Sequence, residues 1–185
     1  MAENSCGSCS GCASAPLTDS MFCFQCEQTA RGTACTTTGV CGKSATQSQL
    51  QDRLTGTLVA LARVEDNNAT DATWRIVLEG LFTTITNVSF SDEAVEAQIQ
   101  KTLDEIDRLC GESCDPKTCS CEPLDMNTLW TGNEDVRSLK SLLLLGLRGM
   151  AAYAYHAYVL GLTDDTVNRF MLKALKALGE DLPAE

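Results

Sequence analysis

Four cysteines near the start of this chain constrain its fold more than any other feature, because they follow one another with the spacing C-x2-C-x8-C-x5-C. They are Cys23, Cys26, Cys35 and Cys41. The segment around them has neither a helical nor a strand period. Such a backbone has no apolar face to bury, whereas four thiolates that converge on a metal centre give it something to fold around. Residues 21–43 are therefore predicted to form an irregular metal-binding loop.

The spacing favours one [4Fe-4S] cluster over a single zinc ion. A C-x2-C turn places two thiolates at adjacent corners of a cubane, and the longer intervals carry the other two around it. A zinc site built from four cysteines usually pairs two short knuckles of close cysteines, and this segment has only one. Gly32, Gly39 and Gly42 allow the backbone to approach a cluster closely. A zinc site and unligated thiols remain the alternatives.

The composition of the chain argues against stabilising disulfides, nucleic-acid binding and membrane binding. A chain of 185 residues can bury a core of its own, so its eleven cysteines are not needed as stabilising disulfides. With 14 basic and 25 acidic residues and a formal charge of -11, the chain lacks the basic cluster that nucleic acid or a membrane surface would require. Its first residues lack the pattern of a leader peptide, which favours the cytoplasm, where cysteines stay reduced.

The most apolar stretch, residues 141–162, is long enough to span a bilayer but contains Arg148 near its middle. An arginine at the centre of a bilayer costs about 2.5 to 3.5 kcal/mol even on the lenient insertion scale. We therefore predict a buried helix at this position, and no membrane span.

The rest of the first half has helical periodicity, and no segment has the pattern of a convincing strand. Helices are predicted over about residues 44–64, 71–87 and 92–110, joined by short turns as in an antiparallel three-helix, spectrin-like bundle. Ser91 is a suitable N-cap for the third helix, and Gly111 is expected to end it.

The second half predicts two further helices, one over about residues 134–160 and one capped by Thr163. Two helices cannot easily bury two such wide apolar faces, so they are expected to form part of a second bundle. The predicted fold is all-α. It divides into a flexible Cys-rich tail, the cluster loop, a first bundle, a Cys-containing loop and a second, incomplete bundle at residues 1–20, 21–43, 44–111, 112–133 and 134–185.

Two runs of this chain, FCFQCEQTARGTAC and the following GVCGK, resemble the amino-terminal signature of hybrid cluster proteins, which are also called prismane proteins. The second helical signature of that family is similar to EDVRSLKSLL and to GMAAYAYHAYVLG, which begin at Glu134 and Gly149. The resemblance covers most of residues 21–178. It implies an ordinary [4Fe-4S] cluster ligated by Cys23, Cys26, Cys35 and Cys41.

The chain departs from this family in one respect. The resemblance implies that family members continue into two α/β domains, whose His, Glu and Cys side chains hold the hybrid cluster where hydroxylamine or nitric oxide is reduced. None of those positions exists in this sequence. His156 lies within the helical signature with no cysteine or carboxylate at i±4, so we predict a packing histidine rather than a catalytic one.

Seven further cysteines lie outside the matched signature: Cys6, Cys9, Cys12, Cys110, Cys114, Cys119 and Cys121. They could supply ligands for a second iron-sulfur cluster. The later four could also surround a zinc ion. The alternative is a tail and a surface loop that carry reduced thiols.

Two functions follow from the sequence. The first is an electron-transfer module that delivers electrons from its cluster to a redox protein or a catalytic subunit. The second is the amino-terminal portion of a hydroxylamine or nitric oxide reductase whose active site lies outside this chain. A purely structural cluster is a third interpretation, and the sequence does not predict an oligomeric state.

Overall fold

The computed structural model describes residues 16–27, 30–65, 67–111 and 121–183. The chain is an all-α bundle with no strand in these ranges, as the sequence predicted. A short 3-10 helix, η2, lies in the cysteine loop. The elements are η2 (Ala30–Gly32), α1 (Ala45–Val64), α2 (Asp71–Thr83), α3 (Asp92–Cys110), α4 (Met126–Leu129), α5 (Glu134–Val159) and α6 (Asp165–Leu178).

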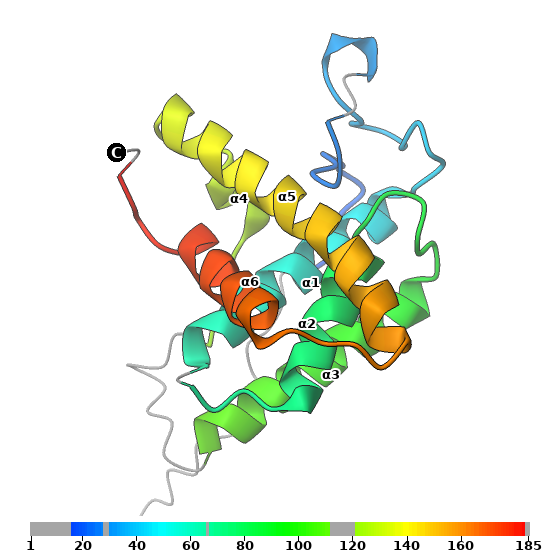
Figure 1. The fold of residues 1–185 in the computed structure, drawn as a ribbon. Coiled ribbons are helices and arrows are strands. Elements are labelled where there is room, and N and C mark those ends of the chain that lie inside the picture. Colours follow the sequence, from blue (N-terminus) through cyan, green and yellow to red (C-terminus); the bar gives the residue numbers. More distant parts are fainter. Residues whose placement is uncertain (1–15, 28–29, 66, 112–120, 184–185) are drawn as a thin grey trace, which may run out of the picture.

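Helix α1 is the centre of the fold and contacts α2, α3, α4 and α6 (Figure 1). Ser44 caps it in a reciprocal capping box with Gln47, which fixes where the preceding loop ends. Its leucines at positions 50, 54, 58 and 61 are all fully buried. The leucine stripe that predicted this helix is therefore its core face.

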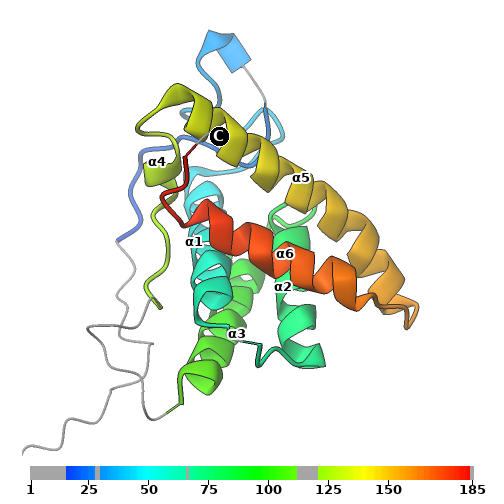
Figure 2. The ribbon, with the colours of Figure 1, turned by 60° about the vertical axis from the view of Figure 1, so that its left-hand side comes forward.

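Helices α5 and α6 pack against the first bundle through α2 and α1 (Figure 2). Helix α5 packs on α2, and α6 packs on α1, so that buried apolar residues of all these elements form one cluster. The outer side of this layer still exposes large apolar side chains. They are Leu139, Leu142, Tyr153, Val159, Leu160, Leu162 and Phe170.

Several helix ends differ from the sequence prediction. Helix α2 ends at Thr83, because the Thr84 hydroxyl donates to the Leu81 carbonyl and the backbone turns there. Asp164 rather than Thr163 caps α6, since its carboxylate accepts from two amides of the first turn. Helix α4 was not predicted.

The segment before α4 lies directly against α1. The Leu124 amide donates to the Gly56 carbonyl at 3.1 Å, and only a glycine leaves room for this approach. None of the helices in the described part of the chain has the length and apolarity needed to cross a bilayer. Arg148 is buried within α5, with 3% of its surface exposed, but α5 as a whole is not the buried helix that the sequence predicted, because Leu142 and Tyr153 on it are exposed.

Candidate iron-sulfur site

The cysteine loop lies at the N-terminal end of α1 and beside α5 (Figures 1 and 2). Its two halves are joined by a hydrogen bond of 3.1 Å from the Cys23 amide to the Cys35 carbonyl. Its last turn is closed by bonds from the Gly39 amide to the Lys43 carbonyl, at 2.8 Å, and from the Gly42 amide to the Gly39 carbonyl, at 2.9 Å. Because Ser44 then caps α1, this turn is attached rigidly to the central helix.

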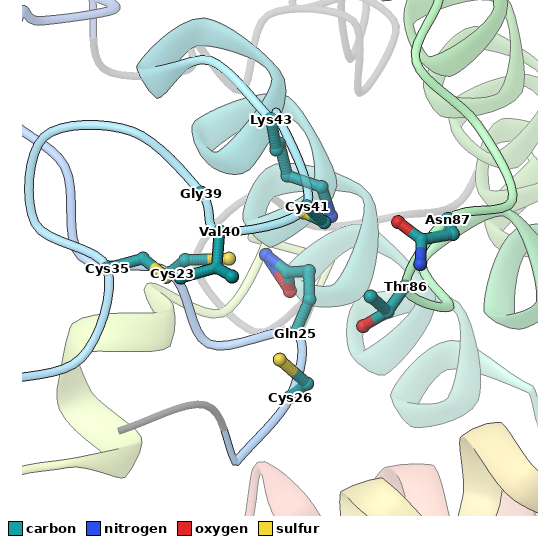
Figure 3. Close-up of a pocket in the computed structure, with 10 residues that line it drawn as sticks. All are labelled: Cys23, Gln25, Cys26, Cys35, Gly39, Val40, Cys41, Lys43, Thr86 and Asn87. Carbon is teal, nitrogen blue, oxygen red and sulfur yellow. The ribbon is translucent and has the colours of Figure 1, made fainter. Parts of the chain in front are cut away.

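All four predicted ligands line one cavity of about 320 Å³ (Figure 3). Cys35 is buried, Cys23 and Cys41 are half-buried, and Cys26 is exposed. The rest of the wall comes from the loop itself and from the turn after α2. These lining residues are Gln25, Gly39, Val40, Lys43, Thr86 and Asn87.

The donors around the cavity are four thiols, and none of the described histidines or carboxylates lines it. Within the described ranges, no three or more His, Cys, Asp or Glu side chains are arranged around a single metal ion. A tetrahedral zinc ion would need its sulfur ligands about 2.3 Å from one point. A cluster would bind each thiolate through a different iron and would take its four ligands from separate sides of such a cavity.

The backbone before Cys35 is held in left-handed conformations that residues other than glycine rarely adopt. Arg31 has φ 55° and Ala34 has φ 65°. Asn87, across the cavity, has φ 65°. Such residues cost free energy and persist only where the surrounding structure fixes them, and they concentrate at binding sites.

Two buried basic side chains, Lys43 and Arg148, lie beside the cavity. Lys43 is 1% exposed and donates through Nζ to the Gln51 side chain, which is itself anchored by the carbonyls of Thr83 and Ser89. Burial lowers the pKa of Lys43, and the thiols of Cys23 and Cys41 act in the opposite direction.

Arg148 reaches the loop from α5. Burial lowers the pKa of Arg148 to about 10, so the guanidinium stays protonated at neutral pH. It donates to the Phe24 carbonyl at 3.0 Å and to Oε1 of Gln25 at 3.2 Å. Gln25 in turn donates to Asp52 at 2.7 Å. Burial raises the pKa of Asp52 to about 8, although Arg148 and Lys43 lower it.

The other predicted residues lie elsewhere. Cys110, at the end of α3, is half-buried, and Cys121 is buried. His156 is exposed on α5, and its ring meets the edge of Phe82 at a centroid distance of 5.5 Å. The remaining predicted ligands, Cys6, Cys9, Cys12, Cys114 and Cys119, lie outside the described residues.

Sequence reasoning missed the polar residues behind the loop. Gln25 and Lys43 were visible only as parts of the cysteine motif, and Asp52 gave no signal. Arg148 did give a signal in the sequence, because an arginine in the middle of an apolar stretch needs buried hydrogen-bond acceptors. The sequence did not show which residues would supply these acceptors to Arg148.

Several curated proteins are similar to this chain over nearly its whole length. A hydroxylamine reductase of Thermoanaerobacter pseudethanolicus is 38% identical over 190 residues, which cover 90% of this chain and 35% of that protein. Hydroxylamine reductases of Nitratidesulfovibrio vulgaris and Methanococcus vannielii are 38% and 36% identical and cover 89% and 88% of this chain. The chain spans about a third of the length of the curated relatives it matches.

The family comparison covers both the loop and the bundle. The profile of the Prismane/CO dehydrogenase family matches residues 21–183, which include the four cysteines and every α-helix in the described part of the chain. The match and the relatives agree with the resemblance seen in the cysteine loop and in α5. The chain therefore belongs to the Prismane/CO dehydrogenase family.

Proposed function

We propose that this chain binds one [4Fe-4S] cluster through Cys23, Cys26, Cys35 and Cys41 and that it serves in electron transfer. When bound, such a cluster supplies a one-electron carrier. The protein contributes four thiolates, the cavity that they line, and the buried basic side chains of Lys43 and Arg148 beside it. A cytoplasmic location, where thiols stay reduced, suits this function.

One observation supports the proposal above all others. Four cysteines from a single loop line one cavity, and the guanidinium of Arg148 is bonded to the two residues between the first pair of them. Structural packing alone does not explain a buried guanidinium that forms no ion pair with a described carboxylate, because charged side chains are costly to bury without opposite charge nearby. A cluster bound by four thiolates has net negative charge and would balance it.

The test is metal and sulfide analysis of protein purified without oxygen. About four irons and four sulfides per chain would support the single cluster, and about eight of each would add a second cluster on the other cysteines. Zinc without sulfide would refute the cluster. Electron paramagnetic resonance of the dithionite-reduced protein would then show whether the cluster accepts an electron.

Cys26→Ser separates the ligand assignment from general effects of losing a thiol. The variant is expected to lose or degrade the cluster while its helix content stays close to that of the wild type, since Cys26 is exposed and makes no part of the core. Cys110→Ser changes a half-buried cysteine outside the cavity and should keep the absorption of a single cluster, whereas a loss of absorption in this variant as well would indicate a second cluster on the other cysteines. Unchanged cluster absorption in Cys26→Ser would contradict the assignment.

We further infer that the electrons go to a catalytic unit of the hydroxylamine reductase kind. The relatives are hydroxylamine reductases about three times as long as the matched region, and the family resemblance assigns their catalytic centre to domains beyond that region. The exposed apolar side chains of α5 and α6 support a further protein surface there, because large exposed apolar patches mark interfaces.

Two measurements test the acceptor. The chain alone is expected not to reduce hydroxylamine at an appreciable rate, and robust turnover with a defined electron donor would contradict this. The mass of the protein in its native cells then separates the two arrangements. A mass near 19.9 kDa indicates a separate subunit, and a mass about three times larger indicates one portion of a longer reductase.

A further inference from the structure

Arg148 is bonded at every nitrogen of its side chain although it lies fully inside the protein. Nε donates to Oγ1 of Thr84 at 3.1 Å, and Nη1 donates to the Phe24 carbonyl at 3.0 Å. Nη2 donates to Oε1 of Gln25 at 3.2 Å and to Oγ1 of Thr55 at 3.4 Å. All four acceptors are neutral groups, so they satisfy the hydrogen bonds of the guanidinium without neutralising its charge.

The positive charge of Arg148 has no direct partner in the described structure. No carboxylate of the described residues forms an ion pair with it, and Asp52 is connected to it only through the amide of Gln25. An unpaired buried charge is costly, and a nearby opposite charge recovers part of that cost. Asp52 acts on the guanidinium more strongly than any thiol, but burial raises the pKa of Asp52 to about 8 and keeps this carboxyl protonated at neutral pH. The thiols of Cys23 and Cys26 flank the two residues that Arg148 holds and also act on the guanidinium, so the cysteine cavity is the adjacent place where negative charge would gather.

The contacts also fix the geometry of the loop. Phe24 and Gln25 are the two residues between the first pair of cysteines, and Arg148 holds both of them. The amide of Gln25 is oriented on its other side by Asp52 and by the Ser48 carbonyl, at 2.7 Å and 3.3 Å. The ring of Phe24 stacks on Trp130 at a centroid distance of 4.9 Å. The C-x2-C turn is therefore clamped from α5, α1 and the segment after α4.

We propose that Arg148 is a positioning residue of the cluster site, which holds the Cys23–Cys26 turn in its ligating shape and raises the reduction potential of the cluster by its charge. The proposal rests on the cluster proposed above. Adding an electron makes the cluster more negative, so a fixed positive charge nearby favours the reduced state. The hydrogen bonds and the charge are separate contributions, and different substitutions of Arg148 remove them separately.

The experiment compares the wild type with Arg148→Met and Arg148→Lys by redox titration monitored with electron paramagnetic resonance. Arg148→Met removes the charge, and its equilibrium constant for reduction is expected to fall at least tenfold, which is about 59 mV for one electron. Arg148→Lys keeps the charge but not the planar fork. Its equilibrium constant for reduction should stay within about threefold of the wild-type value. Arg148→Lys should nevertheless bind less iron and show an altered electron paramagnetic resonance signal.

Arg169→Met is the matched control, because Arg169 is an exposed arginine on α6 and the change in net charge is the same. It should leave the potential and the iron content unchanged. A wild type without iron and sulfide would refute the cluster and this proposal together. A loaded wild type whose potential and iron content are unchanged in a folded Arg148→Met would refute only the role of Arg148. If Arg148→Met does not fold, a wild-type signal and iron content in Arg148→Lys would overturn it.

Discussion

Asp52→Asn tests whether burial or the nearby basic side chains dominate the pKa of Asp52, which lies behind the cysteine loop. Asp52 lies on α1, is only partly exposed, and accepts a hydrogen bond of 2.7 Å from Gln25. Burial raises its pKa from 3.8 to about 8, because the charged form loses its hydration. Arg148 and Lys43 act in the opposite direction but with less effect. Asparagine keeps the acceptor oxygen for Gln25 and cannot ionise.

The sign of the effect follows from proton binding. Between pH 3.8 and about 8 the folded chain keeps a proton on Asp52 that the unfolded chain has released. The free energy of unfolding therefore falls as pH rises through this window and is flat above it. The pKa difference corresponds to an upper limit of about 6 kcal/mol. The free energy of unfolding of Asp52→Asn does not fall in this way. The difference in unfolding free energy between the variant and the wild type should therefore grow by a few kcal/mol, in favour of the variant, as pH rises through this window.

The assay is urea denaturation of chelator-treated protein, followed by far-UV circular dichroism, at several pH values between about 4 and 8. Asp104→Asn is the control, because it removes an exposed carboxylate from α3. The difference between variant and wild type cancels the titration of the cysteines, which both proteins share. A variant that instead becomes less stable than the wild type as pH rises would show that Arg148 and Lys43 hold Asp52 ionised.

Two further predictions concern helix α1, which follows the cysteine loop: the close packing of the segment before α4 on it, and its N-terminal cap. Gly56→Ala would place a Cβ 2.1 Å from the Leu124 carbonyl oxygen, and because backbone cannot yield as a side chain can, urea denaturation should show a loss of about 3 kcal/mol. Gly80→Ala meets only the side chain of Leu58, at 2.9 Å, and should cost less, so equal losses would contradict the close approach of Leu124 to α1. Ser44→Ala removes the cap of α1 and should cost about 1 kcal/mol in the same assay, whereas an unchanged stability would mean that the capping box contributes nothing.

The sequence predicted the helices well where a local rule decides them. Ser91 caps α3, and Gly111 with φ 59° ends it, as expected from residue type alone. Helix α4 has only four residues, which is too short for any apolar period to appear. The end of α2 was missed because the Thr84 side chain competes for a backbone carbonyl, an interaction that periodicity does not contain.

The sequence could not predict what α5 and α6 pack against. An amphipathic stripe shows that one face is buried but does not identify the neighbouring helix, and the sequence predicted part of a second bundle without naming the helices that these two would contact. In the structure they lie on α2 and α1. The cysteine site, too, was predicted only in part. The spacing indicated that Cys23, Cys26, Cys35 and Cys41 converge, but the contact of Arg148 with Phe24 joins residues 124 positions apart.

The same helix that exposes apolar side chains also reaches into the cysteine loop. Helix α5 touches the loop at two points, through Arg148 and through the Ser141 hydroxyl, which lies 3.3 Å from a carboxylate oxygen of Glu27. Its outward face carries Leu142 and Tyr153, the latter 83% exposed. A protein surface that covered these residues would contact the helix that holds the C-x2-C turn. Because helices are rigid elements, a shift of α5 under such a surface would also move Arg148 and the turn between Cys23 and Cys26 that it holds.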